Sequence, residues 1–123
     1  MRVIGLVALA HGLSHFFQIA TAVVFPLIKD DLGVSYVALG GTVALYYTVS
    51  GICQTAAGFA VDRYGARRVL FLGLILSTAG ALIAGFAHGY AMLVAAAIVG
   101  GLGNSVFHPC DFSILNARGS GRW

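Results

Sequence analysis

Hydrophobic residues fill four long stretches of the chain, and polar residues gather in the short segments between them. The apolar stretches cover about residues 3–28, 36–61, 69–87 and 90–109. Each is close to the roughly 20 residues that a helix needs to cross the 30 Å hydrocarbon core of a bilayer. The connections at 29–35, 62–68 and 88–89 leave no room for a water-soluble domain. The pattern therefore predicts an all-α, polytopic membrane protein with four transmembrane helices.

The composition supports a membrane protein. Of the 123 residues, 59% are hydrophobic and only 9% are charged, whereas water-soluble domains carry about 25% charged residues. A soluble helical bundle would need polar outer faces, which this chain lacks. The first stretch begins like a secretory signal, with Ala-Leu-Ala at 8–10 resembling a cleavage site. It continues to Ile28, however, and this length favours a retained membrane helix.

The basic residues predict how the chain is oriented. With four spans, six arginines fall on one side, namely Arg2, Arg63, Arg67, Arg68, Arg118 and Arg122. The other side holds only Lys29, beside Asp30 and Asp31. Short cytoplasmic loops carry the excess of Lys and Arg, so we expect a multi-pass protein of the inner (plasma) membrane with both termini cytoplasmic. These arginines flank membrane spans, and a nucleic-acid partner is not expected.

Polar side chains within the apolar stretches form stripes at helical spacing. They are His11, His15 and Gln18 in the first span, Tyr47, Ser50 and Gln54 in the second, and Asn104, His108 and Asp111 at the fourth. Residues spaced i, i+4 and i+7 lie on one face of a helix. Polar groups in hydrocarbon usually face a bundle interior or a water-filled path. We expect His11, His15, Gln18, Gln54, Asn104, His108 and Asp111 to line a path for substrate or protons.

An alternative for these residues is that they join helices by hydrogen bonds across a dry interface. The third span offers only Ser77 and Thr78, which can bond to their own backbone, and it is expected to be peripheral. On the same span, Ser77, Ala81 and Gly85 form a ridge of small residues that predicts close helix packing.

Pro109 leaves the carbonyl of Ser105 without its helical partner, and so marks either a functional kink or the end of the fourth span. Cys53 and Cys110 are predicted at different depths and form no CxxC pair, so no metal site or redox motif is expected. No nucleophile is paired with a base at usable spacing, and the sequence predicts neither an enzyme nor a cofactor.

The charged segment after the second span resembles a known signature. Gly58, Asp62, Arg63, Gly65, Arg67 and Arg68 resemble the loop signature between helices two and three of major facilitator superfamily transporters. Three further segments, HGLSHFFQ, FPLIKDDLGVSY and GLGNSVFHP, resemble the fosmidomycin-resistance branch of drug exporters. Together the resemblance covers residues from about 11 to 116.

The resemblance implies an inner-membrane transporter that exports small molecules or drugs against inward proton flow. In that superfamily helices one and four line the central cavity, helix three is peripheral, and the loop aspartate and arginine help to lock the two halves together. This implies a gate motif made of the six residues that carry the signature. The superfamily uses two six-helix halves. The chain is therefore expected to be a partial N-terminal transmembrane domain over 1–123, with the first four of twelve helices and with the missing C-terminal helices as partners.

Two alternatives remain open at this point. A small four-helix multidrug transporter that works as a dimer has a similar length, but that family depends on a membrane-embedded glutamate and this chain contains no Glu. A non-transporting membrane subunit is a second alternative.

Overall fold

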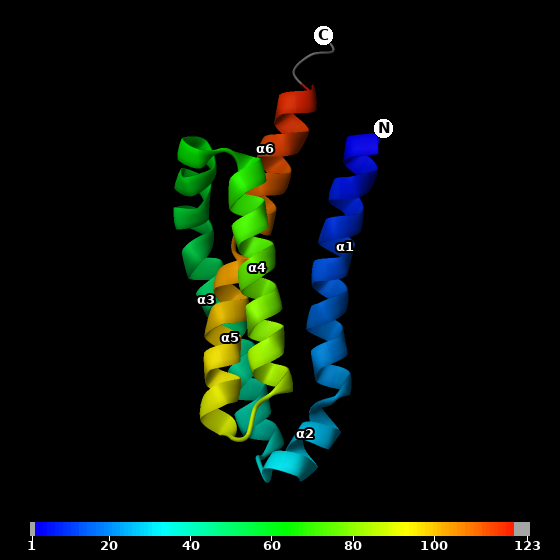
Figure 1. Ribbon diagram of the computed structural model, residues 1–123, viewed down its shortest axis with the longest axis vertical. Coiled ribbons are helices and arrows are strands. Elements are labelled where there is room, and N and C mark those ends of the chain that lie inside the picture. The colour runs from blue at the N-terminus through cyan, green and yellow to red at the C-terminus, as the bar shows by residue number, and fades with distance from the viewer. Residues whose placement is uncertain (1, 120–123) are drawn as a thin grey trace.

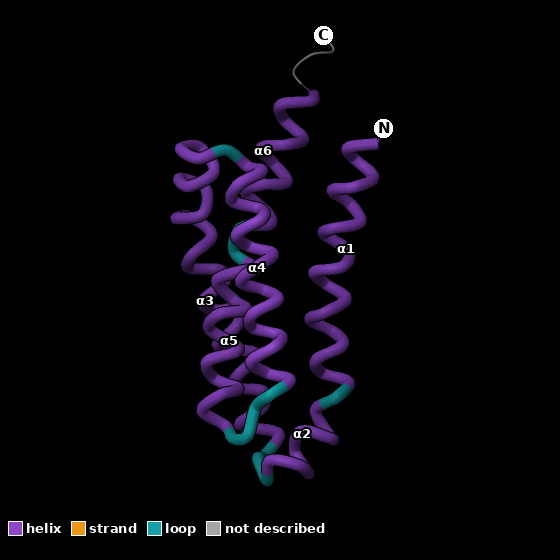
Figure 2. Tube along the Cα trace, in the orientation of Figure 1, coloured by secondary structure: helices purple, strands orange, loops and turns teal. Residues whose placement is uncertain are grey.

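The computed structural model describes residues 2–119. This part of the chain is helical with short connections and contains no strand (Figures 1 and 2). The helices are α1 Arg2–Val23, α2 Phe25–Leu32, α3 Tyr36–Tyr64, α4 Ala66–Gly85, α5 Tyr90–Asn104 and α6 Phe107–Gly119. Four stretches are long and apolar enough to cross a membrane, Ile4–Val23, Tyr36–Tyr64, Ala66–Gly85 and Tyr90–Ala117. The predicted all-α membrane architecture with four spans is confirmed.

The first apolar stretch is not the single helix over 3–28 that the sequence predicts. α1 ends at Val23, and α2 carries Pro26 in its first turn. Proline has no backbone N–H, so the carbonyl of Ala22 loses the partner that would continue the helix. As a result α2 lies across the end of the bundle (Figure 1) and ends at Gly33, whose φ of 63° is in the left-handed region.

The charged segment predicted to connect the second and third spans is almost wholly helical. α3 continues through Asp62 and Arg63, and α4 begins at Ala66 instead of at the predicted residue 69. Only Gly65 separates the two helices, with a φ of 86° that glycine adopts without steric penalty. Long charged side chains can extend from a helix into water, so the charges mark the edge of the membrane and not the end of the helix.

The fourth apolar stretch extends beyond the predicted end at residue 109. After α5 a turn at Ser105 and Val106 precedes α6, and the candidate span reaches Ala117. Cys110 therefore lies within the span and not at its end. Residues 120–123 lie outside the described part of the chain.

Pro109 interrupts this span and does not end it. It stands in the first turn of α6, where its missing N–H would have met the carbonyl of Ser105. The helical pattern continues on both sides of the turn, since Ser105 N–H bonds to the carbonyl of Gly101 at 3.1 Å and Cys110 N–H to that of Val106 at 3.0 Å.

α5 packs between α3 and α4 through glycines. A Cβ added to Gly80 of α4 would come 2.7 Å from the backbone nitrogen of Gly100, and one added to Gly103 would come 2.5 Å from that of Ser77. On the other side, a Cβ on Gly101 would meet the carbonyl oxygen of Tyr46 in α3 at 2.6 Å. These three helices can therefore approach closely only because the contact positions lack side chains.

The small-residue ridge predicted on the third span is only partly correct. Ser77 faces α5, but Ala81 and Gly85 are exposed, and a Cβ on Gly85 would meet nothing within 4 Å. The contact face instead runs along Gly73, Ser77 and Gly80. These positions also share one helical face, and the glycines of α5 select this face over the neighbouring one.

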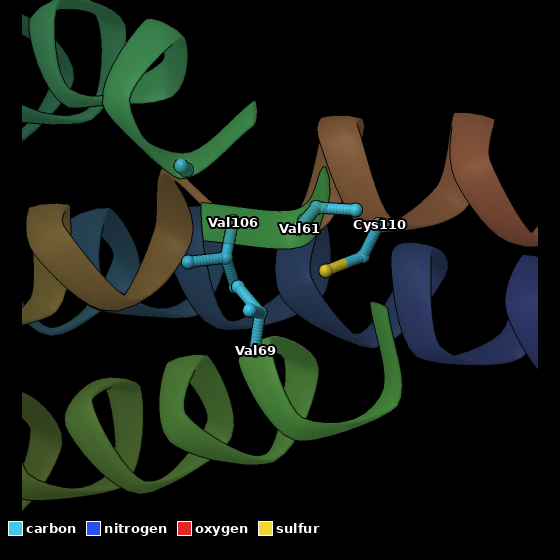
Figure 3. Packing of buried hydrophobic residues seen from close by; sticks show 5 residues of the cluster. Val61, Val69, Val106 and Cys110 are labelled. Carbon is cyan, nitrogen blue, oxygen red and sulfur yellow. The ribbon is translucent and has the colours of Figure 1, made fainter. Parts of the chain in front are cut away.

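A small apolar core lies at the end of the bundle near the α3–α4 connection. Figure 3 shows Val61 of α3, Val69 of α4, Val106 of the turn before α6 and Cys110 of α6 gathered together. Cys110 is fully buried, and its thiol lies 3.4 Å from the carbonyl oxygen of Ala66 as a weak donor. This core ties the start of α6 to the helices on either side of Gly65.

α1 stands beside this bundle and is not packed into it (Figure 1). None of the side chains described in α1 is buried. α1 is joined to the other helices through α2 at one end and through polar side chains near its middle. The start of α1, the α3–α4 connection and the end of α6 lie at one end of the molecule, and α2 lies at the other (Figure 1).

Candidate functional site

A cavity of about 200 Å³ lies between α1 and the helices α3, α5 and α6. It is lined by His11, Ser14, His15, Gln18, Tyr47, Ser50, Gly51, Gln54, Asn104, Phe107 and His108. None of these belongs to α4. His15, Ser50 and Asn104 each fall near the middle of their spans, so the cavity lies near half depth in the membrane. Polar groups at this depth are costly unless they have partners or water.

One side of the cavity is held by an ion pair between α1 and α6. Nδ1 of His11 lies 2.7 Å from Oδ2 of Asp111. Asp111 is only 13% exposed, which removes most of its hydration and makes this hydrogen bond its main compensation. The turn before α6 places Asp111 on the same helical face as His108, one turn away.

His15 extends the pair along α1. Its Nε2 lies 3.1 Å from Nε2 of His11, and the two rings meet edge to face at 4.8 Å between centroids. The ring of His108 approaches His11 at 5.1 Å from the α6 side. Three imidazoles therefore lie together, and the central one, His11, bonds to the carboxylate of Asp111. The cavity lining contains no Lys or Arg.

Amide and hydroxyl groups link the other wall of the cavity. The hydroxyl of Tyr47 donates to Oε1 of Gln18 at 2.9 Å, and Nε2 of Gln18 donates to Oδ1 of Asn104 at 3.0 Å. Nδ2 of Asn104 then donates to the hydroxyl of Ser50 at 2.8 Å. This chain connects α3, α1 and α5 and fixes the orientation of both amides.

The structure brings the predicted path residues together. His11, His15, Gln18, Gln54, Asn104 and His108 all line the cavity, and Asp111 lies next to it on His11. Tyr47 and Ser50, which belong to the polar stripe of the second span but were not among the predicted path residues, complete the amide chain.

Three lining residues were missed by the sequence reasoning. Ser14 lies one turn from His11, and its hydroxyl donates to the carbonyl of His11 at 2.7 Å. Its spacing of i+3 would have placed it on the same face. Gly51 and Phe107 carry no polar signal and could be found only from the packing.

The six residues of the expected gate motif lie away from the cavity, at the end of the bundle. Asp62, Arg63, Arg67 and Arg68 are exposed, and within residues 2–119 Asp62 forms no ion pair. The guanidinium of Arg63 lies over the ring of Tyr64 at 5.7 Å. The charges of this segment are therefore available to groups outside the described residues.

Gly58 does not mediate a close helix contact within the described chain. A Cβ built there would meet nothing within 4 Å. None of the described helices therefore approaches closely at Gly58. The glycines that bring described helices together lie between α4 and α5 and between α5 and α3.

The cavity offers hydrogen bonds and titratable groups but no metal cage. Among residues 2–119, no group of three or more His, Cys, Asp or Glu side chains is placed to hold a metal ion. His11, His15 and Asp111 are engaged with one another. What the arrangement can do chemically is bind a polar ligand and exchange protons with it or with water.

Comparison with known proteins identifies relatives for almost the whole chain. The model of the Major Facilitator Superfamily matches residues 7–117. The chain is 26% identical to the fosmidomycin resistance protein of Escherichia coli over 121 residues, which is 98% of this chain and 30% of that protein. It is 30% identical to a multidrug resistance protein B homolog of Mycobacterium tuberculosis over 122 residues, 98% of this chain and 22% of the relative.

A third relative is the bacillibactin exporter of Bacillus subtilis, 29% identical over 91 residues that make up 70% of this chain and 23% of the exporter. The chain thus spans less than a third of the length of these relatives. No solved structure matches the chain.

Proposed function

The chain belongs to the Major Facilitator Superfamily of membrane transporters, and we propose that it serves the export of small molecules in exchange for protons as one part of a longer transporter. The substrate path is the cavity between α1, α3, α5 and α6. The observation that carries this proposal is a set of polar side chains from four helices that meet at half depth of an otherwise apolar bundle.

Proton coupling is supported by the chemistry of the cavity. Histidine is the side chain that normally changes its charge between about pH 5 and pH 8. His11 lies within contact of both His15 and His108, and Asp111 stabilises a positive charge on His11. Ionisable groups facing a cavity inside a membrane are typical of proton relays in transporters.

A longer transporter is supported by the relatives. Each of the three described here is more than three times as long as the segment that the chain matches. Their names refer to resistance or export, which favours outward transport as the direction. Helices beyond those described would then supply the opposite wall of the cavity.

The proposed gate and orientation are supported by the arrangement of charges at one end. Arg63 lies in the last turn of α3, and Arg67 and Arg68 lie in the first turn of α4, whereas Lys29 belongs to α2. The α3–α4 connection lies at the same end of the molecule as the start of α1 and the end of α6, and α2 lies at the other end (Figure 1). We assign the arginine-rich end to the cytoplasm. Asp62 and Gly58 present an exposed charge and an open helix surface there, on which a further helix can dock with its N-terminus against the carboxylate.

The experiment is a chimera. The chain replaces the 121-residue region that it matches in the fosmidomycin resistance protein, and the chimera is expressed in cells that lack this protein. We expect growth on fosmidomycin to be restored. A chimera that reaches the membrane at normal levels without restoring growth contradicts the proposal. Resistance conferred by the 123-residue chain alone would instead favour a small dimeric transporter. A chimera that binds fosmidomycin without exporting it would favour a non-transporting subunit.

A further inference from the structure

His11 and His15 face each other through the same ring atom. Nε2 of His15 lies 3.1 Å from Nε2 of His11, and Nδ1 of His11 lies 2.7 Å from Oδ2 of Asp111. An ionised carboxylate only accepts hydrogen bonds, so Nδ1 of His11 carries a hydrogen whenever Asp111 is ionised. The two facing nitrogens share one hydrogen, because one must donate and the other accept. The three groups form a continuous line of hydrogen bonds.

This line has room for one additional proton. In the neutral form of both rings, Nε2–H of His15 donates to His11. With one proton added, either ring becomes an imidazolium and every hydrogen bond of the line is kept. A second proton would place N–H groups on both facing nitrogens and two positive charges on rings 4.8 Å apart. Like charges at such a distance disfavour each other.

His108 and Tyr47 are the other titratable side chains that line the cavity around this line. From α6, the ring of His108 lies 5.1 Å from that of His11, so a charge on either disfavours a charge on the other. From α3, the titratable group lining the cavity is Tyr47, which donates to Gln18. From α6, the thiol of Cys110 turns away toward α4. With one proton the line is electrically neutral, and without it the line carries one negative charge.

We propose that Asp111, His11 and His15 act as one proton-binding unit that holds a single exchangeable proton. His15 is exposed and is the point of entry. A proton that binds Nδ1 of His15 allows its Nε2 hydrogen to pass to Nε2 of His11. His15 is then neutral again and His11 is an imidazolium whose Nδ1–H still donates to the carboxylate. Asp111 is a positioning residue, since its hydrogen bond decides which nitrogen of His11 carries the hydrogen.

The role of this proton-binding unit in transport rests on the proposed proton coupling. The following test measures proton binding and not export. The purified 123-residue chain is placed in lipid nanodiscs with His108→Gln as background, which leaves His11, His15 and His88 as the imidazoles of the chain. Proton uptake is measured by titration from about pH 8 to pH 5, the range in which histidine titrates. His88 lies exposed in the α4–α5 connection, outside the line, and His88→Gln is the control.

The shared proton predicts a non-additive result. His11→Gln and His15→Gln should each leave the uptake unchanged, and the double variant should lower it by one proton per chain. His88→Gln should lower it by one proton on its own. A loss of one proton from each single variant would overturn the proposal, and so would an unchanged uptake in the double variant.

A second measurement needs no variant of the histidines. Nitrogen NMR of ¹⁵N-histidine-labelled wild-type chain at about pH 8 should show His11 protonated at Nδ1 and His15 at Nε2. Asp111→Asn should lose this preference at His11, and Asp111→Glu should restore it at least in part. Finding His11 protonated at Nε2 in the wild type would overturn the proposal. If the chain passes both measurements and the chimera exports nothing, the export function alone is refuted and the proton-binding unit stands.

Discussion

Asp111 of α6 accepts a 2.7 Å hydrogen bond from Nδ1 of His11 in α1, a residue 100 positions away in sequence. No described side chain of α1 is buried, so α1 has little apolar packing to hold it. The His11–Asp111 pair and the Gln18–Asn104 bond are therefore the main ties between α1 and the bundle at the level of the cavity. Polar ties of this kind can open and close, which a transport path requires.

Breaking the tie should destabilise the docking of α1. His11→Phe keeps an apolar ring in the span but removes a charge-assisted hydrogen bond, which contributes about 1.5–3 kcal/mol. We expect the distribution of distances between spin labels on α1 and α6 to broaden and to shift to longer distances. Leu13→Phe, at a position 48% exposed on the other side of α1, is the matched control. An unchanged distance distribution in His11→Phe would show that α1 is held by other contacts.

The glycine contacts between α4 and α5 should be intolerant of a methyl group. Gly103→Ala forces a Cβ toward the backbone of Ser77 and Gly73, and overpacking of this kind costs about 1–3 kcal/mol of unfolding free energy. At Gly40 in α3 nothing lies within 4 Å, so Gly40→Ala should be neutral or slightly stabilising. Unfolding in mixed micelles measures both variants. Equal stabilities would mean that α4 and α5 are not packed as closely as described.

Much of this architecture could be predicted from the sequence, because four apolar stretches and stripes of polar residues follow directly from the cost of burying polar groups in lipid. The stripes on the first and fourth spans predicted the residues that meet in the cavity. Helix ends were less predictable. The charges at Asp62 and Arg63 suggested a loop, but a helix can continue past the membrane edge with its charged side chains in water.

The tertiary contacts could not be predicted. Pro109 was compatible with a kink or with an end, and only the continuation of α6 decides between them. The sequence predicted a contact face on α4 that includes Ala81 and Gly85, whereas the observed face includes Gly73 and Gly80. Small residues occur on several faces of α4, and the position of the glycines of α5 determines which face makes the contact. The direct line from His15 through His11 to Asp111 depends on the packing of α1 against α6, which spacing along one helix does not specify.

The orientation of the chain can be tested by labelling. In a background of Cys53→Ala and Cys110→Ala, a cysteine replacing Asp30 of α2 should react with a membrane-impermeant thiol reagent added outside the cell. A cysteine replacing Ala66, at the start of α4, should react only after the membrane is opened. The expectation follows from the excess of arginine at the α3–α4 end. Reversed labelling would place the arginine-rich end outside.

Substitutions in the segment around Gly65 should separate its two proposed roles, as a gate and as an orientation signal. Acidic residues contribute little to orientation, whereas a carboxylate at a helix N-terminus contributes about 0.3–1 kcal/mol. In the chimera, Asp62→Asn should therefore reduce export without changing topology. Arg67→Ala combined with Arg68→Ala should also weaken the topology signal. Normal export by Asp62→Asn, together with loss of function in the arginine variant, would leave the segment as an orientation signal only.

The most direct test of the central claim is substrate-driven proton movement through the cavity. Inside-out vesicles carrying the chimera are given a proton gradient and a pH-sensitive dye, and fosmidomycin is then added. The account predicts that the substrate dissipates part of the gradient in the chimera and in His88→Phe. It predicts at least a tenfold smaller response in His15→Phe and His108→Phe at equal membrane levels, which corresponds to about 1.4 kcal/mol. Proton movement that is unchanged by both cavity substitutions would contradict the account.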